Sequence, residues 1–204
     1  MKALISTGGQ GPDFEKVKDI FTHVNLVVAA DSGLNRLVEW GIEPDFLVGD
    51  GDSIDTDNVA TKKYSYNPAP RDKDFSDTEL AIIKCLEKGA DEIILIGGGE
   101  GRLDHTLSNV GMVKKYAQIS LWMTSKEIIT ILSPGNFITH HLPQTQLSIF
   151  PLDDHSGPVK TRGLVWELEH IDLNQSMSLS NRCVDSEINW EITQGRFLLL
   201  ATYE

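Results

Sequence analysis

The sequence is poor in cysteine and has no long apolar run. Its 204 residues hold two cysteines, Cys85 and Cys183, and no Cys-x-x-Cys motif. That excludes a disulfide scaffold and a zinc-finger type of site. No apolar run approaches the ~20 residues of a membrane-spanning helix, and the first apolar residues run directly into Thr7-Gly8-Gly9, too soon for a signal peptide. We therefore expect a cytoplasmic protein with no membrane partner.

Positive charge is also scarce. Lysine and arginine number 18 against 30 aspartates and glutamates, a net charge of −12. Because a basic surface supplies most of the affinity for nucleic acid, we expect no nucleic-acid partner. Nucleotides are not excluded, since a metal ion screens their phosphates. The acidity has two readings: it favours the approach of a cationic substrate, or it only maintains solubility.

The composition, 40% hydrophobic and 24% charged, is that of a globular protein of one or two domains. Up to about residue 125, short apolar strands alternate with helical patterns. We expect strands at 2–6, 25–30, 46–48, 92–96 and 118–123. Residues 55–70 read as a surface segment. The alternation predicts an α/β domain over residues 1–125, with an open, mostly parallel sheet and flanking helices.

The pattern changes after residue 125. Turn residues recur at short intervals, residues 188–192 alternate in polarity, and residues 197–200 form an apolar run. Short strands with frequent turns predict an all-β domain over residues 126–204.

An acidic stretch follows the third expected strand. Gly49 and Gly51 let the backbone bend while Asp50 and Asp52 point alike. Two neighbouring carboxylates stay ionised most easily around a hard cation, and Mg²⁺ combines one or two carboxylates with phosphate oxygens. The stretch is therefore a candidate Mg-phosphate site. The alternative reading is an ordinary Asp-Gly turn. An EF-hand calcium loop fits the pattern less well, because Ile54 stands where that loop has an oxygen ligand.

Two more aspartates lie at the boundaries of expected elements: Asp31 follows a strand, and Asp77 lies at the beginning of a helix. Asp31 follows the strand at 25–30, so it would face the same crevice beyond the strand ends as Asp50; its other reading is a helix N-cap. Ser76-x-x-Glu79 predicts a capping box. Asp77 then lies in the first helical turn, either as a third metal carboxylate or only because the helix dipole favours an anion there.

A glycine-rich loop, Gly97-Gly98-Gly99-Glu100-Gly101, joins the strand at 92–96 to the next helix. This arrangement offers backbone amides to phosphate at a helix N-terminus. Arg102 strengthens that reading, because a guanidinium fork matches phosphate oxygens. Lys73 is placed to meet phosphate as well, although most lysines are only solvated. The loop has neither the Walker nor the Gly-x-Gly-x-x-Gly pattern.

Four stretches stand out in this order: Ala30-Asp31-Ser32-Gly33-x-Asn35-Arg36-Leu37, Pro44-Asp45-x-x-x-Gly49-Asp50-x-Asp52-Ser53-Ile54, Lys73-Asp74-x-Ser76-Asp77-x-Glu79-Leu80-Ala81 and Gly101-Arg102-Leu103-Asp104-His105-x-x-x-Asn109. A pair, Ser180-Asn181, follows later in the chain. The four stretches resemble the thiamine pyrophosphokinase family, and the later pair is similar to that family's Ser-Asn pair.

The resemblance implies transfer of a pyrophosphoryl group from ATP to the hydroxyl of thiamine, giving thiamine diphosphate and AMP, with Mg²⁺ as cofactor. It implies that the second domain is a β-sandwich that binds thiamine, and that the chain forms a homodimer. The implied residues group by role. The metal ligands are Asp50, Asp52 and Asp77, which are also catalytic together with Arg102; the ATP contacts are Asp31, Lys73, Ser76, Arg102 and Asp104; the thiamine contacts are Ser180 and Asn181.

The chain departs from the family pattern at four places. Gly51 stands where a bulky apolar residue is common, and Ser76 where threonine is usual. Glu100 puts a carboxylate beside the phosphate loop, and Arg182 replaces the glutamate expected after Ser180-Asn181. The last two bear on the phosphate and thiamine contacts. Two rival functions stay open: a Mg-dependent phosphotransferase or phosphohydrolase acting on another acceptor, and a nucleotide-binding module without catalysis.

Overall fold

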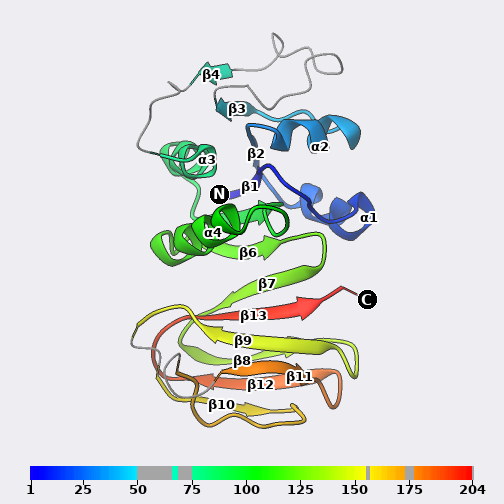
Figure 1. The fold of residues 1–204 in the computed structure, drawn as a ribbon, viewed down its shortest axis with the longest axis vertical. Helices are drawn as coiled ribbons and strands as arrows, with labels where there is room; N and C mark the ends of the chain where they lie inside the picture. Colours follow the sequence, from blue (N-terminus) through cyan, green and yellow to red (C-terminus); the bar gives the residue numbers. More distant parts are fainter. Residues whose placement is uncertain (50–65, 69–74, 155–156, 173–176, 204) are drawn as a thin grey trace. The chain divides into compact units, whose positions relative to one another are not determined.

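The structure is a computed structural model that describes residues 1–49, 66–68, 75–154, 157–172 and 177–203 (Figure 1). The chain divides into two compact units, Met1–Lys126 and Glu127–Glu204. We call them the N-terminal unit and the C-terminal unit.

The N-terminal unit alternates strands and helices. Its strands are β1 (Lys2–Ser6), β2 (Leu26–Ala30), β3 (Phe46–Gly49), β4 (Tyr66–Pro68), β5 (Glu92–Ile96) and β6 (Ile119–Met123). Its helices are α1 (Phe14–Val17), the 3₁₀ helix η1 (Lys18–Thr22), α2 (Gly33–Glu39), α3 (Asp77–Glu87) and α4 (Leu103–Lys115). The strands lie in the order β6-β5-β1-β2-β3-β4 and pair in parallel throughout.

This order contains a switch point. From β1 the chain moves through β2 to β3 on one side, whereas from β5 it moves to β6 on the other. Because such crossovers are right-handed, the two directions place their helices on opposite faces of the sheet. Figure 1 shows α1 and α2 on one side of the strands and α3 and α4 on the other. In open α/β sheets, ligands bind beyond the carboxyl ends of the strands at such a point, here between β1 and β5.

Local sequence explains these elements. The strands are short apolar runs because both sheet faces are covered: Leu4 in β1 and Leu95 in β5 are wholly buried. Helix α3 turns Ala81, Ile82 and Cys85 inward. It ends in a Schellman motif, with Gly89 at φ 86 and the Ala90 amide donating to the Cys85 carbonyl over 3.0 Å. Burial raises the pKa of the Cys85 thiol to about 12, so it is the inert core residue that the sequence predicts.

The C-terminal unit is entirely β. Its strands are β7 (Glu127–Leu132), β8 (Gly135–His140), β9 (Gln146–Pro151), β10 (Val159–Arg162), β11 (Ser178–Arg182), β12 (Glu187–Ile192) and β13 (Phe197–Thr202). They pair antiparallel in two groups, β11-β9-β13-β7 and β10-β12-β8. One core unites both groups: Ile149 and Leu199 from the first contact Ile188 and Trp190 from the second. The predicted fold class, an α/β sheet followed by an all-β sandwich, is confirmed.

Three local details differ from the sequence predictions. Within the expected surface segment 55–70, residues Tyr66–Pro68 form the parallel edge strand β4. The first helix is split into a short α turn and a 3₁₀ turn. Asp31 is not an N-cap, since that position of α2 belongs to Ser32.

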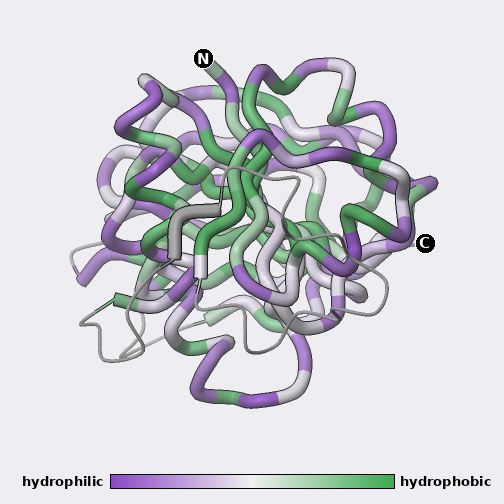
Figure 2. Tube along the Cα trace, turned by 90° about the horizontal axis from the view of Figure 1, so that it is seen from above, coloured by the Kyte–Doolittle hydropathy of each residue, from purple (hydrophilic) through white to green (hydrophobic). Residues whose placement is uncertain are grey.

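Hydrophobic stretches alternate with hydrophilic ones within a few residues along the trace (Figure 2). This short period follows from strands of four to six residues in most of the fold. Among the described residues, no helix combines the length and apolar character that crossing a bilayer requires.

Candidate active site

A cavity of about 380 Å³ lies in the N-terminal unit at the carboxyl ends of its strands. Its walls come from the loops after β1, β2 and β5 and from the N-terminal turns of α3 and α4. The lining includes four residues that the sequence singles out: Asp31, Ser76, Asp77 and Arg102. The cavity therefore occupies the switch point, where the topology alone favours a ligand.

Two predicted carboxylates meet around the end of β3. Gly49 is the last residue of β3, and a β-carbon added to it would lie 3.2 Å from Oδ1 of Asp77 and 3.3 Å from Cβ of Asp31. Asp31 adopts the left-handed conformation at φ 48, which aspartate tolerates better than most residues. Its amide donates to the Val48 carbonyl over 2.8 Å. Three separate elements thus bring together Asp31, Asp77 and Gly49, the residue immediately before Asp50.

Three predicted residues cannot be placed. Asp50, Asp52 and Lys73 lie outside the described residues. Among the residues that the structure does describe, no group of three or more side chains could hold a metal ion. The described donors are still of the right chemistry, because the oxygens of Asp31 and Asp77 suit a hard cation such as Mg²⁺ and not a soft one.

Ser76 caps the helix that carries Asp77. Its Oγ accepts a hydrogen bond from the Glu79 amide over 3.2 Å, so half of the predicted capping box is present. The reciprocal half is absent. The buried Glu79 carboxylate instead accepts hydrogen bonds from Lys115 Nζ at 2.6 Å and from the Tyr116 hydroxyl at 2.7 Å. Glu79 therefore fastens α3 to the end of α4.

That contact also shifts the titration of Glu79. Burial raises the pKa of its carboxyl group, but the hydrogen bonds from Lys115 and Tyr116 and the charge of Lys115 outweigh burial, so the pKa is lowered overall. Near its N-terminus, α3 is tied to the loop after β1, because the hydroxyls of Thr78 and Thr7 lie 2.6 Å apart. Two adjacent residues of the first turn of α3, Thr78 and Glu79, thus fix this end of the helix next to the cavity.

The glycine-rich loop after β5 is shaped by tightly packed neighbours. A β-carbon on Gly98 would overlap the Asn109 side chain, and φ is 72 at this glycine. Asn109 Nδ2 donates to the Gly98 carbonyl over 3.3 Å, and Trp122 Nε1 donates to the Gly97 carbonyl over 2.7 Å. Larger residues could not follow this path, so the loop presents its backbone to the cavity.

Arg102 and Asp104 form an exposed ion pair at the start of α4. Arg102 Nη2 lies 2.5 Å from Asp104 Oδ2, and both side chains are more than half exposed. The hydrogen bond from Arg102 lowers the pKa of Asp104, and the pKa of Arg102 is raised in turn. Exposed pairs of this kind are weak, so exchange of Asp104 for a phosphate as the partner of Arg102 costs little.

Glu100, one of the departures from the family pattern noted in the sequence, has partners for its negative charge. Its Oε1 accepts from Ser125 Oγ at 2.6 Å and lies 3.0 Å from Lys126 Nζ. These contacts lower the pKa of the Glu100 carboxyl group. The extra negative charge is therefore paired at the end of β6, and the loop keeps its capacity for an anion.

In the C-terminal unit, Ser180 and Asn181 lie in β11 but differ in their surroundings. Ser180 is exposed, with φ 53 beside a bulge in the β9–β11 pairing. Asn181 is 1% exposed. Its Oδ1 accepts from the amides of Trp166 and Arg182, and its Nδ2 donates to the Trp166 carbonyl at 2.8 Å and to Ser178 Oγ. Asn181 therefore fixes the backbone of Trp166.

Trp166 is a residue that the sequence reasoning missed. Its side chain is 57% exposed, and the guanidinium of Arg182 lies 6.0 Å from its ring centroid. The signal was present in the sequence as a tryptophan three residues after Gly163, but the tertiary contacts with Asn181 are what fix its backbone. An exposed indole held in this way suits a cation.

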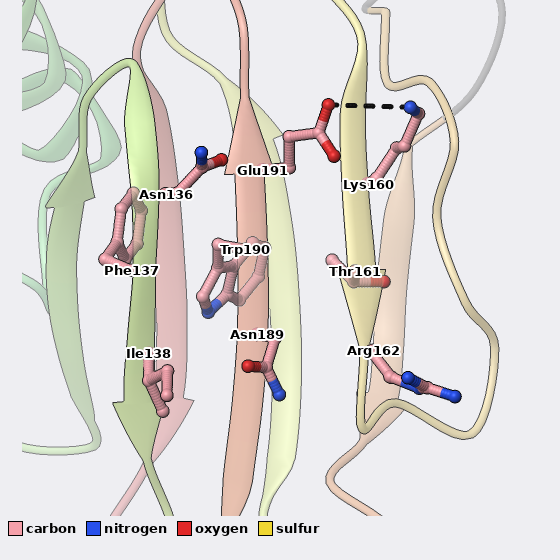
Figure 3. A pocket seen from close by; sticks show the side chains of 9 residues that line it. All are labelled: Asn136, Phe137, Ile138, Lys160, Thr161, Arg162, Asn189, Trp190 and Glu191. Carbon is pink, nitrogen blue, oxygen red and sulfur yellow. Dashed lines mark hydrogen bonds and ion pairs between the residues drawn. The ribbon is translucent and has the colours of Figure 1, made fainter.

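A second cavity, of about 460 Å³, lies on the outer face of β8, β10 and β12 (Figure 3). Its carboxylate, Glu191, pairs with Lys160 at 3.5 Å across the two strands. Its other lining groups are two asparagine amides, one hydroxyl, one guanidinium and three apolar or aromatic side chains, those of Asn136, Asn189, Thr161, Arg162, Phe137, Ile138 and Trp190. With its one acid already paired, this surface offers no acid-base or metal chemistry comparable to that of the first cavity.

The fold and the site define an α/β protein with an acidic, glycine-lined cavity at its switch point and an appended β-sandwich. A family description, thiamin pyrophosphokinase, catalytic domain, matches residues 17–123, slightly more than half of the chain. The chain belongs to the thiamin pyrophosphokinase family of enzymes, and the resemblance drawn from the sequence is confirmed.

Similar proteins agree with this family. The chain is 26% identical over 199 residues to thiamine pyrophosphokinase of Bacillus subtilis, covering 93% of this chain and 91% of the relative. It is 23% identical to thiamin pyrophosphokinase 1 of Caenorhabditis elegans, with 85% and 77% covered. A crystal structure of thiamin pyrophosphokinase from Geobacillus thermodenitrificans shares its fold, with a TM-score of 0.81, 24% identity, and 100% and 98% coverage.

Proposed function

We propose that the protein transfers the pyrophosphoryl group of ATP to the hydroxyl oxygen of thiamine, giving thiamine diphosphate and AMP. The observation that carries this proposal is the meeting of Asp31, Asp77 and the β3 end with two glycine loops in one cavity of a member of this family. Carboxylates beside backbone amides suit a metal-bound polyphosphate.

The N-terminal unit, residues 1–125 in our domain assignment, would bind the nucleotide. Asp50, Asp52 and Asp77 would hold Mg²⁺, which when bound neutralises charge on the phosphate oxygens. ATP or its metal would be contacted by five further residues: Asp31, Lys73, Ser76, Arg102 and Asp104. In the reaction the thiamine oxygen bonds to the β-phosphorus and the bond from that phosphorus to the AMP oxygen breaks, so the chain's task is to align these three atoms.

In this reaction Arg102 would act on the leaving group. Its guanidinium leaves Asp104 and stabilises the negative charge that shifts toward the leaving AMP. The helix dipole of α4 adds to this effect, since Arg102 stands at its N-cap.

The β-sandwich, residues 126–204, would bind thiamine. Thiamine carries a fixed positive charge, and the exposed Trp166 indole, held by Asn181, offers a cation-π surface for it. Ser180, exposed beside the bulge, supplies a hydroxyl for the pyrimidine. We further propose that the chain works as a homodimer and that it acts in the cytoplasm. Light scattering of the purified protein tests whether it is a dimer.

The function is tested by incubating the protein with Mg-ATP and thiamine and identifying the products by mass spectrometry. We expect thiamine diphosphate and AMP in equal amounts. Release of ADP with thiamine monophosphate, or transfer to other alcohols but not to thiamine, would assign a different phosphotransferase. Saturable ATP binding with no product would assign a binding module. The Asp50→Asn variant should stay folded and lose most turnover; near-normal turnover would remove Asp50 from the site.

A further inference from the structure

Behind the cavity, a partly buried arginine joins the loop after β1 to the end of β5. Arg36 lies in α2 and does not line the 380 Å³ cavity itself. Its Nη1 donates to Ser6 Oγ at 3.1 Å, to the Thr7 carbonyl at 2.8 Å and to the Ile96 carbonyl at 3.5 Å. Its Nη2 donates to the Gly9 carbonyl. One side chain thus bonds to the carboxyl ends of both β1 and β5.

These contacts lie at the switch point. Ile96 ends β5 and immediately precedes the glycine-rich loop, whereas Thr7 and Gly9 belong to the loop after β1. The β1 loop, residues 7–13, has no regular secondary structure of its own, so its course depends on side-chain contacts. The fit around Arg36 is close: a β-carbon on Gly97 would lie 2.8 Å from Nη1 and 2.6 Å from the Thr7 carbonyl oxygen.

The positive charge of Arg36 also bears on what the cavity can bind. Among the described residues its hydrogen-bond acceptors are neutral, three carbonyls and one hydroxyl. Burial lowers its pKa, which the charge of Glu39 partly offsets, but a guanidinium keeps its proton in proteins. A partly buried positive charge with neutral acceptors favours an anion in the adjoining cavity.

We propose that Arg36 is a positioning residue for the nucleotide: it fixes the two glycine loops relative to each other and supplies a permanent positive charge behind the polyphosphate. The proposal rests on the proposed function for the identity of that anion. Lysine cannot replace the arginine, because a single ammonium lacks the fork that reaches the carbonyls of both the β1 loop and the end of β5.

The test measures binding of Mg-ATP by calorimetry without thiamine, and steady-state kinetics with both substrates, for Arg36→Lys and Arg36→Gln. We expect the Kd and KM for Mg-ATP to rise about tenfold in Arg36→Lys and further in Arg36→Gln, which also loses the charge. The KM for thiamine should stay within about twofold. A merely structural role would lower the folded fraction and leave both KM values unchanged.

Arg196→Lys is the matched control. Arg196 is also a partly buried arginine, its guanidinium held by two hydrogen bonds to Asp153, and lies in the other unit. The Arg196→Lys protein should bind Mg-ATP with the same affinity as the wild type. A folded Arg36→Lys protein whose Mg-ATP affinity lies within about twofold of the wild type would overturn the proposal.

Ser6→Ala serves if the Arg36 variants do not fold. It removes one acceptor of Arg36 and should raise the Kd for Mg-ATP about threefold; an unchanged Kd would again overturn the proposal. Failure of the proposed function gives a different result, since wild-type protein would then form no thiamine diphosphate while the effect of Arg36 on ATP binding could still be measured.

Discussion

The two units build their candidate sites in different ways. In the N-terminal unit, side chains gather at the ends of parallel strands: Asp31 follows β2 and Asp77 opens α3, yet both border Gly49 at the end of β3. In the C-terminal unit, Asn181 lies within β11 and acts through the loop that it anchors. Parallel strands bring their carboxyl ends to one edge, whereas antiparallel strands leave function to their faces and loops. The difference predicts that variants in the two units separate the two substrates.

Asp77→Asn should have the largest effect. It removes a carboxylate at the strand-end site without changing size, so we expect kcat to fall by about a hundredfold or more while the melting temperature stays close to that of the wild type. Steady-state product formation measures this. Asp19→Asn, an exposed aspartate in η1, is the control and should behave as the wild type. Comparable activity in both variants would place the chemistry elsewhere.

Asn181→Ala tests the other side of the comparison. It leaves the backbone groups of Trp166 without their partners, so the KM for thiamine should rise about tenfold with the KM for ATP unchanged. Because Asn181 is buried, its loss also destabilises the unit, and the melting temperature must be measured alongside. Trp166→Ala, at an exposed position, should raise the KM for thiamine without that destabilisation. An unchanged KM in the latter variant would exclude Trp166 from the thiamine site.

The contact of Glu79 with Lys115 and Tyr116 predicts a pH dependence of stability. The pKa of Glu79 in the folded protein lies below its ordinary value of 4.5. A depressed carboxyl pKa contributes stability that is fully present above the unfolded pKa and is lost as pH falls through the folded pKa. Denaturant titrations at successive pH values below about 4.5 should therefore show a steeper loss for the wild type than for Glu79→Gln. Parallel curves would mean that Glu79 has the same pKa in both states.

Glu100→Gln should have the smallest effect. The Glu100 carboxylate is already paired with Lys126 and Ser125, so its removal changes the field at the glycine loop little. We expect the KM for ATP to stay within about twofold. A marked fall in this KM would show that Glu100 does repel the polyphosphate and that the pairing is not maintained in solution.

Much of the N-terminal unit was predictable because its strands are short apolar runs closed by glycine or aspartate. Strand β4 was not predictable, because it is held by pairing with β3 and Tyr66–Pro68 carry no strand pattern of their own. The capping box at Ser76 was predicted in full from spacing, yet the Glu79 carboxylate binds Lys115 and Tyr116, because a partly buried ion pair with a second hydrogen bond outweighs a backbone contact. Such competition between partners does not appear in a local pattern.

The sequence by itself determined the α/β and all-β halves, the family, and which acids and glycines follow which strands, because these depend on periodicity and neighbouring residues. Only the tertiary structure decided that Asp31 and Asp77 share one strand end, that Asn181 is a buried anchor for Trp166, and that Arg36 bonds to the β1 loop and to the end of β5, about 90 positions apart in the chain. These facts depend on strand order and packing, which bring together residues whose separation along the chain carries no signal of their proximity.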